Sequence, residues 1–151
     1  MRPSRRAIAP GDVFALQPVR GNYLFGRVIG TNLFPPLAPM PGSILVYIYR
    51  RSADRPKAPT HLAPDELLLP PLFINRLPWS KGYFETIDHR RLQPADRLQS
   101  HCFWSVNRSQ YLDELGQPRA DRIEPCGSWA LMSYRTLDDA ISDALSVPRA
   151  P

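Results

Sequence analysis

The chain has 151 residues, of which 43% are hydrophobic, so it is long and apolar enough for one domain with a buried core and is not an intrinsically disordered polymer. Its 18 prolines far exceed the usual share of about 5% and predict many loops and edge strands with few long helices. The net charge of +5 is uneven, because residues 1–60 carry nine basic and two acidic groups whereas residues 111–151 carry four and seven, which predicts a polarised surface.

The domain organisation is predicted to be simple. Residues 1–10 are expected to form a flexible basic arm, followed by a single domain over 11–147 and a tail at 148–151. No apolar signal-peptide core follows the N-terminal arginines, and the nearly charge-free stretch 28–49 is broken by glycines and prolines. We therefore expect a cytoplasmic protein without a membrane-spanning helix.

The first elements are expected to be strands. Apolar runs at 13–16 and 23–29, joined by a turn, predict a β-hairpin. The second run is apolar on both faces, which is typical of a strand that is covered on both sides. A proline-rich loop is expected at 31–42. The β-branched and aromatic residues at 43–49 favour a strand, with a polar loop at 50–59.

The middle of the chain is interrupted by prolines. Residues 66–75 are apolar but contain Pro70 and Pro71, so they predict a bent edge segment rather than a central strand. A turn that begins at Pro78 is expected to lead into a strand at 83–87.

The C-terminal part is predicted to contain a hairpin at 101–106 and 110–115, a final strand at 128–133 and a helix. Residues 110–115 fit a helical turn equally well. The helix is expected to begin at Thr136 as N-cap and to end before Pro148. Its apolar stripe is expected to dock on the sheet: Leu137, Ala140, Ile141, Ala144 and Leu145. Together the elements predict an α+β fold of mostly antiparallel β-structure, as a small curved sheet or partly open barrel with one C-terminal amphipathic helix.

Patterns of catalysis, metal binding or cofactor binding are not recognisable in the sequence. His61, His89 and His101 lie in different settings and have no metal-ligand spacing. Cys102 follows His101, but neighbours on a strand point to opposite faces and cannot exchange a proton directly. We therefore expect no enzyme, no metal and no cofactor. In a reducing cytoplasm, Cys102 and Cys126 are expected to be buried free thiols rather than a disulfide.

One possible function is that of a small SH3-like barrel that binds nucleic acid. The N-terminal half is basic, and four aromatic side chains in its strands can be imagined stacking on bases: Tyr23, Phe25, Tyr47 and Tyr49. The competing interpretation is that aromatic residues in strands belong to the core. We favour the core interpretation, and regard nucleic acid as the weaker candidate partner.

Four segments carry a pattern that points to another function. GDVFAL at 11–16 is followed by NYLFGRVIG at 22–30, and LLPPLFIN at 68–75 is followed by PWSKGYF at 78–84. In this order the segments resemble the immunity protein 26 family of bacterial polymorphic toxin systems, over about residues 11–135. The resemblance implies a mostly β, non-catalytic inhibitor that binds and neutralises a cognate protein toxin.

The loops at 31–42 and 50–59 have no counterpart in this resemblance, so any contact there is expected to be particular to this protein. Tight protein interfaces depend on a few aromatic and arginine anchors within a polar rim. Trp79 is the best candidate anchor, because it lies in a turn where burial is not guaranteed; the alternative is that it is an internal plug. Its surrounding contacts are expected to come from residues close in sequence: Arg76, Lys81, Tyr83 and Arg90.

The charge of the chain raises a second possibility for the contact. Because the chain is basic overall, either the toxin is acidic where it binds or the acidic C-terminal third makes the contact. The second case would use four acidic residues: Asp113, Glu114, Asp121 and Glu124. Complementary charge speeds the encounter and rejects wrong partners.

Overall fold

The computed structural model describes residues 1–150, which form two β-sheets and two α-helices. The first sheet contains β1 (Asp12–Val19), β2 (Asn22–Leu33), β3 (Ser43–Ala53), β4 (Leu72–Ile74) and β5 (Glu85–His89). The second contains β6 (Cys102–Ser105), β7 (Gln110–Leu112), β8 (Pro118–Arg119) and β9 (Cys126–Ser128). The helices are α1 (Leu77–Ser80) and α2 (Tyr134–Leu145), with a 3-10 turn, η1, at Pro94–Asp96.

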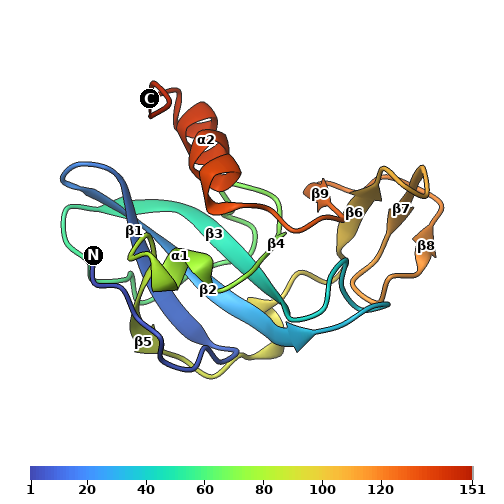
Figure 1. Ribbon diagram of the computed structural model, residues 1–151, viewed down its shortest axis with the longest axis horizontal. Helices are drawn as coiled ribbons and strands as arrows, with labels where there is room; N and C mark the ends of the chain where they lie inside the picture. Colours follow the sequence, from blue (N-terminus) through green and yellow to red (C-terminus); the bar gives the residue numbers. More distant parts are fainter. Residues whose placement is uncertain (151) are drawn as a thin grey trace.

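Both sheets are open. The strand order is β4-β3-β2-β1-β5 in the first and β8-β7-β6-β9 in the second. Among the paired strands within residues 1–150, only β6 and β9 run parallel. Figure 1 shows α2 above the first sheet and the second sheet beyond one end of it. The predicted α+β class, mostly antiparallel with a C-terminal helix, is confirmed, and the sheet is curved rather than closed into a barrel. Within residues 1–150, neither helix has the length and apolar composition needed to cross a bilayer.

The first sheet is covered on both faces, as the pattern of β2 predicts. Leu24 and Val28 point into one core cluster, which also contains residues of α1 and α2. Phe25 and Ile29 point into a second cluster on the opposite face, which contains Phe103 of β6. The apolar side chains of β2 therefore alternate between the two faces, so that one set packs against the C-terminal helix and the other against the second sheet.

Strands β1, β2 and β3 are longer than expected, and β4 lies where it was expected. Strand β2 continues to Leu33 and β3 to Ala53, because the hairpin pairing runs from Tyr23–Ala53 to Leu33–Ser43. Parts of the predicted loops at 31–42 and 50–59 are therefore strand. The apolar segment interrupted by Pro70 and Pro71 supplies β4, which lies at the sheet edge as predicted.

The C-terminal prediction needs two corrections. Helix α2 begins at Tyr134, and its N-cap is Ser133 instead of the predicted Thr136. The Ser133 hydroxyl accepts a hydrogen bond from the Thr136 N–H. The helix ends at a left-handed Ser146. The predicted strand at 128–133 is also wrong: β9 ends at Ser128, since the chain then turns to pack Trp129 against the rings of Phe73 and Phe103.

Candidate functional site

Buried residues make up much of the segments that carry the family resemblance. A Cβ atom on Gly26 of β2 would lie 2.2 Å from the ring of Phe14 of β1. Only glycine therefore leaves room for the Phe14 ring at this position. Arg27 is buried beside it, forms an ion pair with Asp96 at 3.2 Å and donates to the Arg91 carbonyl at 3.3 Å. These residues therefore build the sheet and fasten the connector around η1 to it.

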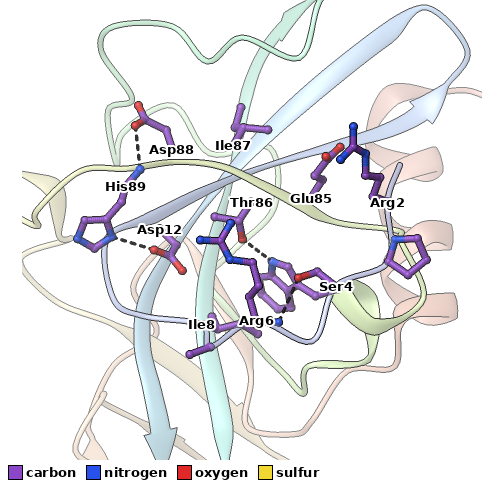
Figure 2. Close-up of a pocket in the computed structure, with 13 residues that line it drawn as sticks. Arg2, Ser4, Arg6, Ile8, Asp12, Glu85, Thr86, Ile87, Asp88 and His89 are labelled. Carbon is purple, nitrogen blue, oxygen red and sulfur yellow. Dashed lines mark hydrogen bonds and ion pairs between the residues drawn. The ribbon is translucent and has the colours of Figure 1, made fainter.

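A hollow lies between the N-terminal segment and β5 (Figure 2). It is a cavity of about 520 Å³ whose wall also includes Trp79. Both signs of charge line it, from Arg2, Arg6, Asp12, Glu85 and Asp88, and His89 is also part of the wall. Among residues 1–150, no cluster of three or more His, Cys, Asp or Glu side chains is placed to hold a metal ion.

Hydrogen bonds across this cavity fasten the N-terminal segment to the domain. The buried Asp12 carboxylate contacts His89 Nδ1 at 2.8 Å through one oxygen and accepts from the Ala9 N–H at 2.9 Å through the other (the contact with His89 is drawn in Figure 2). The hydroxyls of the wall are also engaged, since Thr86 accepts from the Trp79 indole N–H at 3.1 Å and Ser4 from a backbone N–H. The segment predicted as a flexible arm thus lies against β5 and α1.

Trp79 is an internal plug. Its side chain is only 2% exposed, and it lies edge-on to Phe14 and Phe84 with ring centroids 5.3 and 5.1 Å away. The Ser4 N–H donates to its carbonyl at 2.9 Å, so the N-terminal segment helps to cover it. In this position the indole is not available as a surface anchor.

The four residues predicted around Trp79 do not form one surface cluster. Arg76 and Lys81 are exposed at α1. Tyr83 is half-buried and donates to Asp138 of α2 at 2.7 Å; burial, followed by this bond, raises its pKa. Arg90 is half-buried and donates to the Pro59 carbonyl at 2.7 Å, so Tyr83 and Arg90 are both engaged within the domain.

The four acidic candidates all belong to connections of the second sheet. Asp113 and Glu114 follow β7, whereas Asp121 and Glu124 lie between β8 and β9. Glu114, Asp121 and Glu124 are exposed, and Glu124 pairs with Arg122 at 2.6 Å. Residues 110–125 carry four acidic and two basic side chains, so this end of a basic protein is acidic.

An exposed apolar surface, which was not predicted from the sequence, lies beside these acids. The loop after β2 exposes Phe34 by 56%, Leu37 by 43% and Met40 by 51%. Leu115, at the β7–β8 turn, is 49% exposed, and the next residue, Gly116, packs directly on this loop, since a Cβ there would lie 1.9 Å from the Pro36 carbonyl. We call these side chains the loop patch: Phe34, Leu37, Met40 and Leu115. Its signal in the sequence was a group of large apolar residues in a charge-free loop that prolines keep out of a strand.

Glu114 also faces a buried histidine. The Tyr47 hydroxyl accepts from the Leu98 N–H at 3.1 Å and lies 2.6 Å from His101 Nε2. The other ring nitrogen of His101, Nδ1, lies 3.5 Å from the Glu114 carboxylate. Burial lowers the pKa of His101, Arg97 adds to this, and Glu114 acts in the opposite direction. Burial also raises the pKa of Tyr47 to about 12.

This histidine predicts a pH dependence of stability. In the unfolded chain, His101 binds a proton near its ordinary pKa of about 6.5. In the folded chain its pKa is lower, so it binds the proton only at a lower pH. We therefore expect its contribution to the free energy of unfolding to be complete above that pH and to be lost as the pH falls from 7.5 to 5.5. Thermal unfolding across this range should show a steeper loss for the wild type than for His101→Gln. The matched control is His61→Gln at an exposed site, and equal slopes for the wild type and His101→Gln would contradict the prediction.

Comparison with known proteins identifies a family for most of the chain. The family model described as Immunity protein 26 matches residues 9–112, which span β1 to β7 and include the loop at 34–42. No curated protein and no solved structure matches the chain. The match covers more than half of the sequence, and the chain belongs to the immunity protein 26 family.

Proposed function

We propose that this protein binds a cognate protein toxin and neutralises it by surface complementarity, without catalysing a reaction. The family match carries the proposal, because an immunity protein protects the cell that makes the toxin. We place its action inside that cell. The buried frame of glycine, arginine and aromatic residues supports the same idea, since a rigid platform lowers the entropy lost when its loops bind a partner.

We propose the loop patch and its acidic border as the contact surface. Exposed apolar side chains surrounded by polar ones are the usual anatomy of a protein interface. Asp113 and Glu114 adjoin Leu115 in the same turn, so the fitting toxin surface has an apolar hollow bordered by basic residues. The competing surface is Arg76 and Lys81 at α1, which lies away from the second sheet in Figure 1.

A protein partner is favoured over nucleic acid by the burial of the strand aromatics. Phe25, Tyr47 and Tyr49 are fully buried, so their rings are already packed and have no free face to stack on a base. Tyr23 is also packed against the core cluster on that face of the sheet.

Co-expression tests the proposed function. A cell that expresses the toxin encoded beside this gene should stop growing, and this protein should restore growth. The two proteins should co-purify as a complex. The matched control is the same plasmid with an early stop codon in the immunity gene. Continued growth arrest together with separate elution of the two folded proteins would refute the proposal.

A further inference from the structure

Two thiols face each other between β6 and β9. Cys102 and Cys126 are register partners in this parallel pair, and their Sγ atoms lie 2.9 Å apart. Both are buried free thiols, as predicted from the sequence. Register partners on neighbouring strands project to the same face of a sheet, so the contact follows from the strand pairing.

The backbone is already compatible with a bond between them. Neighbouring strands lie about 4.7–4.9 Å apart, and the two Cα atoms of a disulfide are usually about 4.4–6.8 Å apart. Small rotations about the two Cα–Cβ bonds can therefore bring the sulfurs to bonding distance. We propose that Cys102 and Cys126 form a reversible intramolecular disulfide, which makes this pair a redox modification site.

Access to the pair is through Cys126. It lines a cavity of about 160 Å³ together with Pro71, Gly127 and Met132, whereas Cys102 is only 1% exposed and lies behind it. A water molecule occupies about 30 Å³ of liquid volume, so the cavity admits a small hydroperoxide. Cys126 is therefore the first sulfur to react.

The oxidant proposed is a hydroperoxide, and the reaction balances in two steps. The Cys126 thiolate attacks the terminal peroxide oxygen, the O–O bond breaks, and the products are a sulfenic acid and an alcohol, or water from hydrogen peroxide. Cys102 then attacks Cys126 Sγ, the S–O bond breaks, and the hydroxide leaves with the Cys102 proton as water. The two thiols lose two electrons and two protons, and the peroxide gains them. A dithiol reductant reverses the bond by thiol–disulfide exchange.

The surroundings make this reaction slow at neutral pH. Burial, and then the contact with Cys102, raises the pKa of Cys126 to about 12, so little thiolate is present. Because the thiolate is the nucleophile, the rate should rise about tenfold for each pH unit between pH 7 and 9. The pair thus remains a dithiol under reducing conditions and responds to sustained oxidation.

The bond would constrain the part of the protein proposed to meet the toxin. The cysteines are 24 positions apart, and the chain between them contains the acidic connections and Leu115. Closing a loop of this size restricts the unfolded chain. We expect the melting temperature to rise by about 4 °C or more.

The test uses the purified full-length chain and hydrogen peroxide. The expected product is a monomer that has lost two hydrogen atoms by intact mass, resists alkylation when denatured, and yields a Cys102–Cys126 cross-linked peptide. Dithiothreitol should restore both thiols and the original melting temperature. The variants Cys102→Ser and Cys126→Ser should fail to form the product, and the wild-type peptide map remains decisive even if a variant folds poorly. Alkylatable thiols that persist, or oxidation only to sulfinic acid or to disulfide-linked dimers, would overturn the proposal.

Discussion

Replacement of Trp79 with alanine is expected to reduce the free energy of unfolding by about 3–5 kcal/mol, the range for deletion of a large buried aromatic side chain. The indole is enclosed by Phe14 and Phe84 and donates a hydrogen bond to Thr86. Its loss would leave a cavity under the N-terminal segment. Urea unfolding followed by circular dichroism measures the change.

Two control variants separate a structural role of this tryptophan from a binding role. Trp79→Phe keeps a ring and loses the N–H donor, so its cost should be smaller than that of Trp79→Ala. Trp104→Ala removes a tryptophan that is 36% exposed, so it should cost less than Trp79→Ala. At a temperature where Trp79→Ala is folded, it should still bind the toxin. An unchanged stability together with a lost affinity would instead make Trp79 a binding anchor.

The double variant Phe34→Ser with Leu37→Ser is expected to weaken toxin binding by about 100-fold or more, because central apolar anchors dominate interface energies. Both side chains are largely exposed in the free protein, so the melting temperature should stay within a few degrees of the wild-type value. Calorimetric titration of the toxin into each protein measures the affinity, and growth rescue should fail in parallel.

A matched double variant tests the competing surface. Arg76→Ser with Lys81→Ser also replaces two exposed side chains, on α1, and is expected to leave the affinity nearly unchanged. If this variant loses binding and the loop-patch variant keeps it, the toxin contacts α1 and the basic surface there. If both keep it, the contact lies on neither surface.

The buried residues of β2 and the loop residues proposed to bind the toxin are different sets. Gly26 and Arg27 are buried and hold strands and connectors together, whereas Phe34 and Leu37 are exposed on a loop. Such a division allows the loops to differ between immunity proteins that share a frame, because exposed loop residues can change with little effect on stability.

The amino-acid sequence by itself determined the class of fold and the family. Local alternation identified β2 as a strand apolar on both faces, and the prolines at 70 and 71 identified an edge segment, because both patterns depend only on residues close together in the chain. The start of α2 was predicted wrongly because Ser133 and Thr136 are both good N-cap residues. Only the packing of α2 decides which of them begins the helix.

The tertiary structure alone decided where the candidate site residues lie. Trp79 is buried because the N-terminal segment and β5 cover it, and the loop patch forms because a turn 80 positions away packs on Pro36. The contact of Cys102 with Cys126 requires a parallel pairing. Each of these depends on segments that are distant in the chain, and no local pattern encodes which of them will meet, since burial is a property of the assembled core.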